Sequence, residues 1–133
     1  MKARAGFSLI ELMVALVIVG ILAALATGQY RSFVGRGAYA EVILAAKVYR
    51  RSVEVCALEN ALTSCDSGVN GIPLSNPTQA VSSVSVVDAV ITVTPTAFKT
   101  ITPADTYVLT PTGGGAGEPI TAWNDNCNNH NFC

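Results

Sequence analysis

The longest apolar feature of the chain is the run "FSLIELMVALVIVGILAALA", residues 7–26, in which Glu11 is the only charged residue. About twenty residues is the length of a helix that spans a membrane. The short segment before this run is basic, with Lys2 and Arg4, and such a segment favours a cytoplasmic N-terminus. The pattern therefore predicts a membrane-length helix that begins near Phe7.

Helical spacing continues past the apolar run. Apolar residues recur there at steps of three and four: Ala38, Val42, Ala45, Tyr49, Val53 and Cys56. This spacing predicts an amphipathic helix that buries one face against the rest of the chain. We expect one helix over residues 7–60, roughly 80 Å long at the usual helical rise. Its segment 7–30 would protrude as a hydrophobic membrane or assembly segment, and its segment 31–60 would pack.

Glycines interrupt this helical segment at four positions: Gly20, Gly28, Gly35 and Gly37. A glycine in a helix interior costs about 1 kcal/mol relative to alanine. One interpretation is close packing of the helix against a neighbour. The other is a weak stretch that bends or melts when the helix packs into a larger assembly, and both remain open.

Residues 61–133 predict a globular head that contains β-structure. The segment 56–77 is full of Asn, Ser, Gly and Pro and is typical of a loop. The segment 81–95 predicts two strands that turn near Asp88 and Ala89, although alanine resists the positive φ of such a turn. We expect further strands at 106–111 and 120–123, on either side of a glycine-rich connection at 113–119. The predicted fold class is α+β, with the helix covering an antiparallel sheet of about four strands.

Composition adds a charge asymmetry to this picture. The chain has 133 residues, enough for one domain, and a formal net charge of -1. Seven of its eight basic residues lie in the first 51 positions, and Lys99 is the only one after Glu54. A net charge this small excludes a strong general attraction to nucleic acid. DNA binding would need a local basic patch, such as Lys47 with Arg50 and Arg51.

The four cysteines form two pairs that are close in sequence. An even number of cysteines behind an export-type segment indicates disulfides in an oxidising compartment. The most direct of the three connectivities joins Cys56 to Cys65 and Cys127 to Cys133. A zinc site is the alternative, but neither pair has the short gap that zinc sites favour, and His130 is the only histidine.

The C-terminal pair would close the loop "CNNHNFC". The residues inside it offer hydrogen-bonding groups and one aromatic ring: Asn128, Asn129, His130, Asn131 and Phe132. This loop is either a staple that fastens a polar C-terminus or a surface-binding loop. With one histidine, no nucleophile motif and no paired acids, the sequence predicts neither an enzyme nor a cofactor.

Glu11 separates three interpretations of the apolar run. A carboxylate within a spanning helix costs roughly 2.5–3.5 kcal/mol or more and is functional by default. A secretory signal cleaved after Ala26, or a plain membrane anchor, gains nothing from it. If the chain is instead cut between Gly6 and Phe7, the new amine lies four residues before Glu11 on one helical face, where the two charges can neutralise each other.

The residues "KARAGFSLIELM", from Lys2 to Met13, resemble the N-terminus of the type IV pilin family, with a class III leader like that of the major type IVa pilins. The resemblance covers the first 30 or so residues. It implies a leader at 1–6 that a prepilin peptidase removes after Gly6, methylation of the Phe7 amine, and a need for Glu11 in filament assembly. The order of long helix, loop and antiparallel sheet is similar to the pilin fold.

The resemblance also implies the function and the partners. We expect a structural subunit that polymerises with its own copies into a type IV pilus, for adhesion, twitching motility or DNA uptake. Its partners would be the peptidase and methyltransferase, the inner-membrane assembly machinery, minor pilins, and a host or abiotic surface. It would reside in the inner membrane of a Gram-negative bacterium and then in an extracellular fibre. In this family a C-terminal disulfide loop is often a contact surface.

Two other functions remain open at this stage. A minor pilin or a type II secretion pseudopilin would share the same leader. A chain of a different class, a soluble disulfide-bonded binding domain, would begin at Thr27 after cleavage behind Ala26. Filaments of the pilin family often unwind between a glycine and a proline of the helix; this chain has no proline there, and Gly28 stands in that neighbourhood.

Overall fold

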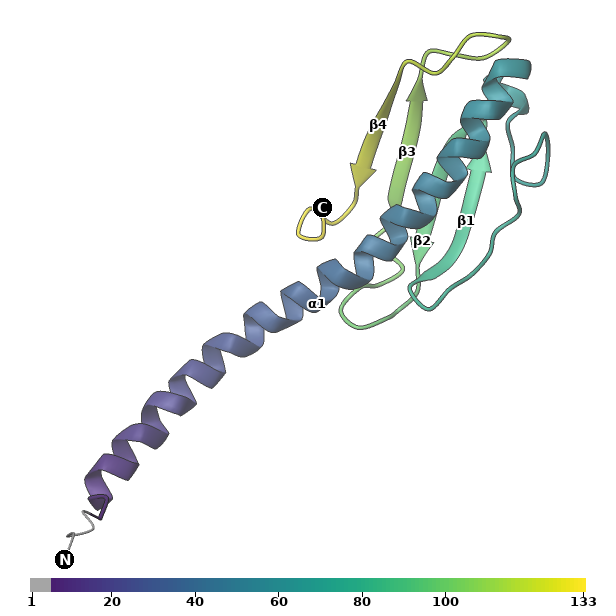
Figure 1. The fold of residues 1–133 in the computed structure, drawn as a ribbon. Coiled ribbons are helices and arrows are strands. Elements are labelled where there is room, and N and C mark those ends of the chain that lie inside the picture. The colour runs from purple at the N-terminus through teal and green to yellow at the C-terminus, as the bar shows by residue number, and fades with distance from the viewer. Residues whose placement is uncertain (1–5) are drawn as a thin grey trace, which may run out of the picture.

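The computed structural model describes residues 6–133, and Figure 1 shows one long helix and one sheet. The elements along the chain are α1 (Leu9–Glu59), the short 3-10 helix η1 (Leu62–Ser64), β1 (Val81–Val87), β2 (Val90–Pro95), β3 (Tyr107–Thr112) and β4 (Ala122–Cys127). The predicted α+β fold with four antiparallel strands is confirmed. The predicted leader, residues 1–6, lies outside the described residues apart from Gly6.

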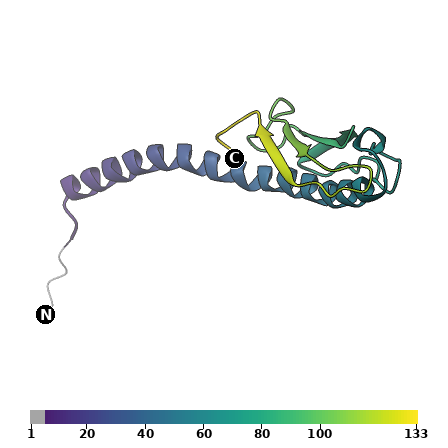
Figure 2. The same cartoon turned by 90° about the horizontal axis from the view of Figure 1, so that it is seen from above.

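Helix α1 is continuous over 51 residues, which makes it about 77 Å long at the usual rise. Its first half projects as an arm, and its second half lies along one face of the sheet (Figure 1, Figure 2). The helix passes through Gly20, Gly28, Gly35 and Gly37 without a break. In this state of the subunit the glycines do not melt the helix.

The packed half of α1 buries one stripe of small and apolar residues: Gly35, Ala38, Tyr39, Val42, Ala46, Tyr49, Val53, Cys56 and Ala57. The sequence prediction placed Ala45 in this stripe; it packs at the edge of the core, and Ala46, which the prediction left out, takes the central position. Ala46 is fully buried and Ala45 is only half-buried. Both positions flank the line from Val42 to Tyr49 at 3.6 residues per turn, and the sheet lies on the side of Ala46.

The four strands form an antiparallel sheet in the order β1-β2-β3-β4, so each strand pairs with its neighbour in sequence. Buried side chains alternate along β2, where Ile91, Val93 and Pro95 point into the core. The same alternation in β3 buries Tyr107 and Leu109. These side chains meet the buried stripe of α1, so the core lies between one helix and one sheet face.

The turn between β1 and β2 takes the conformation that the sequence makes unfavourable. Asp88 and Ala89 both have positive φ, 49° and 66°, as the hairpin twist requires. Such a conformation costs an alanine roughly 1–2 kcal/mol. Ala89 is fully buried and donates its N–H to the carbonyl of Cys65 at 3.0 Å, while the N–H of Asp88 donates to Asp66 at 2.8 Å. These contacts offset the strain.

The fourth strand corrects the sequence prediction. We expected it at 120–123, but β4 begins at Ala122 and continues through "NDNC" to Cys127. Asparagine and aspartate have low intrinsic preference for strands. The pairing with β3 overrides this preference, because every residue of β4 has a partner there, from Ala122 opposite Thr112 to Cys127 opposite Tyr107. The third strand lies within one residue of its predicted position.

The disulfides have the local connectivity. Cys56 near the end of α1 is bonded to Cys65, just after η1, and Cys127 at the end of β4 is bonded to Cys133. The first bond ties the helix to the loop that leads into the sheet. The second closes the C-terminal loop.

Candidate functional site

The first candidate site is the arm, which we define as residues 9–30 of α1. Every residue from Gly6 to Phe33 is exposed. Large apolar side chains dominate this surface, with Leu9 78% exposed and Phe33 77% exposed. The helix is here long and apolar enough to cross a membrane. An apolar surface of this extent marks contact with a membrane or with other chains.

The tip of the arm brings Phe7 and Glu11 together. Ser8 is the N-cap of α1, and its carbonyl oxygen accepts hydrogen bonds from the N–H groups of Glu11 at 3.1 Å and Leu12 at 3.3 Å. Glu11 therefore lies in the first turn, where the positive end of the helix dipole favours a carboxylate. Phe7, Glu11, Leu12 and Ala15 line one shallow hollow on this turn. The two predicted assembly residues thus line the same hollow, with Phe7 just before the N-cap of α1 and Glu11 in its first turn.

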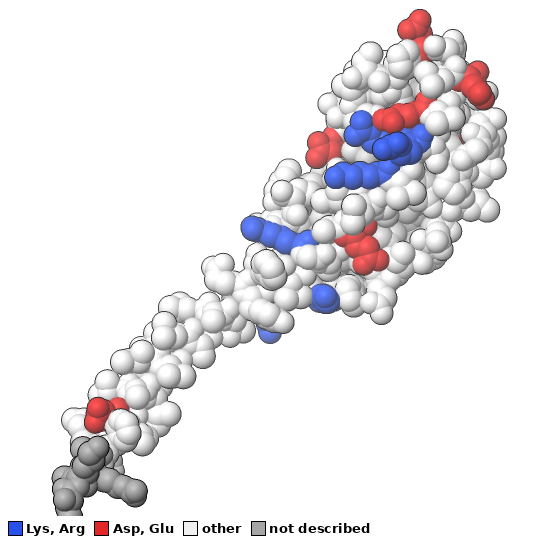
Figure 3. All heavy atoms as spheres, viewed as in Figure 1, with Lys and Arg blue, Asp and Glu red and all other residues white. Residues whose placement is uncertain are grey.

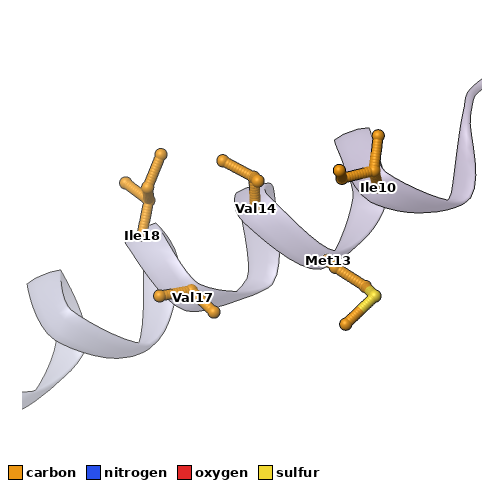
Figure 4. Close-up of a pocket in the computed structure, with 5 residues that line it drawn as sticks. All are labelled: Ile10, Met13, Val14, Val17 and Ile18. Atoms are coloured by element: carbon orange, nitrogen blue, oxygen red, sulfur yellow. The ribbon is translucent and has the colours of Figure 1, made fainter.

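A second hollow on the arm is lined only by apolar side chains. Figure 4 shows Ile10, Val14 and Ile18 in a row on one side of the helix, with Met13 and Val17 on the other. A row at every fourth residue is a ridge that fits the groove of a second helix. The hollow carries no polar group that could orient a polar ligand, so it suits another apolar helix or lipid chains.

The second candidate site is the C-terminal loop, residues 127–133, which lies at the base of the head where the arm begins (Figure 1). The ring of Phe132 stacks on the ring of Tyr39 at 5.5 Å. The Nε–H of Arg36 donates to the carbonyl oxygen of Asn131 at 3.1 Å. A Cβ at Gly35 would lie 2.7 Å from the Phe132 ring, so only glycine leaves room for the loop. The loop is docked on α1.

Two asparagines attach the other side of the loop. The Asn129 amide donates to Oδ1 of Asp105 at 2.8 Å, and the Asn128 amide donates to the carbonyl of Ala104 at 2.6 Å. Of the residues predicted for surface binding, Phe132, Asn129 and Asn128 thus make contacts inside the subunit. His130 and Asn131 are exposed. These contacts support the staple interpretation and leave a small outer face.

Asp105, beneath the loop, is buried and charged. Burial alone would raise the pKa of its carboxyl, but hydrogen bonds from the Asn129 amide and from the N–H and hydroxyl of Thr102 hold this pKa below its ordinary value. Burial, assisted by the Asp105 and Tyr107 groups, raises the pKa of Tyr39 to about 12. The loop is therefore attached through a carboxylate that stays ionised and a tyrosine that stays neutral.

The basic patch predicted from the sequence lies on the outer face of α1. Lys47, Arg50, Arg51 and Glu54 line a groove of about 420 Å³ there, and Figure 3 shows basic side chains gathered over the head. Arg50 donates to Glu54 at 2.8 Å and lies 5.4 Å from the ring centre of Trp123, whose N–H donates to the same carboxylate oxygen at 3.1 Å. One cation of the patch is thus neutralised, which weakens its attraction for a phosphate backbone.

The structure separates the predicted sites. Glu11 at the arm tip and Gly35 at the base of the head are about 36 Å apart along α1 at the usual rise. Among residues 6–133, no three His, Cys, Asp or Glu side chains could hold a metal ion together.

Sequence reasoning missed Tyr39, Asp105 and Trp123. Tyr39 had a signal, because it lies four residues after Gly35 on the packed face, whereas nothing in the local sequence marks Asp105 or Trp123.

Comparison with known proteins agrees with these features. Residues 1–27 match the family model described as the prokaryotic N-terminal methylation motif. The chain is 36% identical over 129 residues to the prepilin peptidase-dependent protein D of Escherichia coli (strain K12), covering 96% of this chain and 86% of that protein. A probable minor fimbrial protein of Dichelobacter nodosus is 41% identical over 70 residues, covering 53% of this chain and 43% of that one.

A solved structure shares the fold. The solution NMR structure of the major type IV pilin PpdD from enterohemorrhagic Escherichia coli matches with a TM-score of 0.54 and 34% sequence identity, over 69% of this chain and 67% of that chain. One of these relatives is named as a pilin, one as a fimbrial protein and one as a prepilin peptidase-dependent protein. An apolar helical arm with one glutamate, a helix-on-sheet head and these relatives lead to one conclusion: the chain belongs to the type IV pilin family.

Proposed function

We propose that this chain is a structural subunit that polymerises with its own copies into a type IV pilus fibre. The observation that carries the proposal is the arm: every residue from Gly6 to Phe33 is exposed, and the arm contains Glu11 as its one charge. Such a surface needs a bilayer before assembly and a bundle of other arms afterwards. The subunit therefore waits in the inner membrane and then enters an extracellular fibre.

The tip of the arm supports processing at Gly6. Cleavage between Gly6 and Phe7, followed by methylation of the Phe7 amine, leaves a positive charge four residues before Glu11. Phe7 and Glu11 line one hollow at the first helical turn, which supports a pairing of these two charges. Before assembly the carboxylate pairs with the amine of its own chain.

In the fibre, Glu11 pairs instead with the Phe7 amine of an adjoining subunit. Packing of apolar ridges such as Ile10, Val14 and Ile18 is nearly indifferent to axial sliding of one helix along another. A carboxylate and an amine are both costly when they are left unpaired in an apolar bundle. The ion pair therefore selects one axial step among those that apolar packing allows.

The test is the variant Glu11→Gln. It should insert, be cleaved after Gly6 and accumulate in the inner membrane, while surface fibres fall steeply because the amide lacks the charge that draws a subunit into register. The measurement is sheared surface fibre against membrane-retained subunit at matched expression. The matched control is Glu41→Gln, the same chemical change in the packed half of α1. Normal fibres from Glu11→Gln would show that Glu11 does not set the axial position of a subunit in the fibre.

A minor pilin is the second candidate, because one of the similar proteins is named as a probable minor fimbrial protein. The two roles differ in stoichiometry. A major subunit makes up most of the mass of a sheared fibre, and its loss abolishes the fibre. A minor subunit is present at a small fraction. Quantitative mass spectrometry of sheared fibres therefore decides between them.

Contacts of the finished fibre would come from the outward faces of the heads. The exposed side chains of His130 and Asn131 are the part of the C-terminal loop that remains for a host or abiotic surface. Lys47 and Arg51 are the cations that remain for DNA in the groove on α1. Fibre binding by variants His130→Ala and Lys47→Ala, each measured against wild-type fibre, tests the two contacts separately.

A further inference from the structure

The charged side chains of the head are separated along its length. At the end where α1 stops lie four carboxylates, which we call the acidic crown: Glu59, Asp66, Asp88 and Glu118. At the end where the arm begins lie three cations, which we call the basic collar: Arg31, Arg36 and Lys99. Figure 3 shows acidic side chains at the far end of the head, a group of basic ones just below them, and separate basic ones nearer the arm.

The crown is assembled from segments that are far apart in sequence. Glu59 is the last residue of α1. Asp66 accepts a hydrogen bond from the N–H of Asp88 at 2.8 Å, which joins the loop after η1 to the β1–β2 turn. The β3–β4 connection, which carries Glu118, donates a backbone hydrogen bond at 3.4 Å to the carbonyl of Ala57. All four carboxylates therefore surround the end of the helix.

The collar is assembled around the first packed turns of α1. The hydroxyl of Thr100 donates to the carbonyl of Arg31 at 3.5 Å, so the neighbouring Lys99 lies beside the helix. Arg36 follows just over one turn later and holds the C-terminal loop through Asn131. All three cations are exposed.

Few side chains of opposite charge lie close to the crown or to the collar. The sequence has no Lys or Arg at positions 52–98 or after Lys99, so the crown segments contain no cation. Near the collar, Asp105 is buried and hydrogen-bonded to Thr102 and Asn129. Glu41 lies five residues beyond Arg36, about 7.5 Å further along α1. Each end of the head therefore has a definite sign.

The opposite charges at the two ends of the head favour one orientation of two subunits that would otherwise repel each other. After removal of Lys2 and Arg4 the side chains carry 6 − 9 = −3 charges, so two subunits repel each other on average. With parallel arms in one bundle, all heads point the same way along the fibre. The crown of one head then faces the collar of the next, and such a head-to-tail contact repeats without closing.

We propose that the acidic crown of one head docks on the basic collar of another copy of this chain further along the fibre. The proposal rests on the proposed function, because only parallel arms hold the heads in one direction. The arms supply the affinity, and the charged ends select the orientation and speed the encounter. An antiparallel approach would place crown against crown and is rejected.

The test reverses each end separately and then both together. The crown variant is Glu59→Lys, Asp88→Lys and Glu118→Lys, which takes the crown from −4 to +2, and the collar variant is Arg31→Glu with Lys99→Glu, which takes the collar from +3 to −1. These positions are chosen because Asp66 caps the Asp88 turn and Arg36 holds the C-terminal loop. Each variant should lower sheared surface fibre about tenfold while the membrane pool of processed subunit stays at the wild-type level.

The five-site variant, with both ends reversed, again places opposite signs on crown and collar, and its side chains carry −3 + 6 − 4 = −1 charges. Its fibre yield should return to within about twofold of wild type. Matched controls are Asp125→Lys and Ser85→Glu, which change the charge at exposed strand positions away from both ends and should leave fibre yield within about twofold. The membrane pool reports folding in every case.

Wild-type fibre yield from either reversed variant would overturn the proposal, and so would a five-site variant no better than the poorer of the two. Equal losses from the control variants would also overturn it, because net charge alone would then explain the effect. Failure of the proposed function looks different: the wild-type chain itself makes no fibre, and the docking proposal falls with it.

Discussion

The ring of Phe132 stacks on the ring of Tyr39, with centroids 5.5 Å apart and planes 30° apart. This contact joins the last residues of the chain to the turn of α1 where the arm leaves the head. Tyr39 also packs edge-on against Tyr107 of β3 at 6.3 Å. The C-terminal loop, the helix and the sheet therefore meet at one aromatic cluster, and the loop is a structural part of the joint between arm and head.

Removal of the Phe132 ring should loosen this joint. We expect Phe132→Ala to lower the free energy of unfolding by about 1–3 kcal/mol, because the half-buried ring loses its contacts with Tyr39 and Gly35. The measurement is chemical unfolding of the full chain in detergent. His130→Ala, in the same loop but exposed, is the control and should change stability by less than about 0.5 kcal/mol. Equal stability of the two variants would contradict a stabilising role of the Phe132 ring at the junction between arm and head.

Gly35 and Gly37 should respond in opposite directions to the same substitution. A Cβ at Gly35 would collide with Thr100 and the Phe132 ring, whereas a Cβ at Gly37 meets nothing within 4 Å in the part of the chain that the structure describes. We expect Gly35→Ala to destabilise the head by about 1–2 kcal/mol through overpacking. Gly37→Ala should stabilise it by up to about 1 kcal/mol through helix propensity. Thermal unfolding of both variants provides the measurement, and stabilisation by Gly35→Ala would refute the tight packing.

Asp105 should contribute stability that disappears in acid. Its pKa is lower in the folded chain than the ordinary value of 3.8, so its contribution is present above pH 3.8 and is lost as the pH falls through the lower folded pKa. Asp105→Asn should therefore reduce stability at pH 7 and flatten the acid limb of the stability profile. Urea unfolding at several pH values measures this. Asn126→Ser, at an exposed position of β4 that carries no ionisable group, should leave the acid limb unchanged.

The C-terminal disulfide should matter for the folded head rather than for membrane insertion. We expect Cys127→Ser with Cys133→Ser to lower stability by about 2–4 kcal/mol and to reduce fibre yield through degradation. Peptide mapping without reduction should show Cys56 linked to Cys65 and Cys127 linked to Cys133. A crossed link between Cys56 and Cys133, or free thiols in the wild-type chain, would disprove this connectivity.

Processing should depend on the residue before Phe7. A peptidase that holds extended backbone closely requires a residue without a side chain at position 6. We expect Gly6→Val to leave full-length precursor in the inner membrane, as seen by its mass and its lack of surface fibre. Gly20→Ala, within the arm, should be processed normally. Mature protein of normal size from Gly6→Val would exclude cleavage at this junction.

The arm and the helix were predictable because their signals are local. Twenty apolar residues with one glutamate, followed by a three- and four-residue repeat, specify a helix whatever the rest of the chain does. The hairpin at 81–95 was predictable from β-branched residues in alternation. Ala89 shows the limit of this reasoning, since its positive φ is unfavourable locally and is held by a buried hydrogen bond to Cys65.

The sequence by itself determined the class of the protein, the exposed arm with Glu11, the α+β order and the pairs of neighbouring cysteines, because each depends on residues close together in the chain. Only the tertiary structure decided that β4 runs through "NDNC", that Phe132 and Asn129 serve the joint, and that carboxylates and cations occupy opposite ends of the head. These features join residues as far apart as Gly35 and Phe132 or Asp66 and Asp88. Their energies come from contacts that exist only after the chain has folded, so no local pattern encodes them.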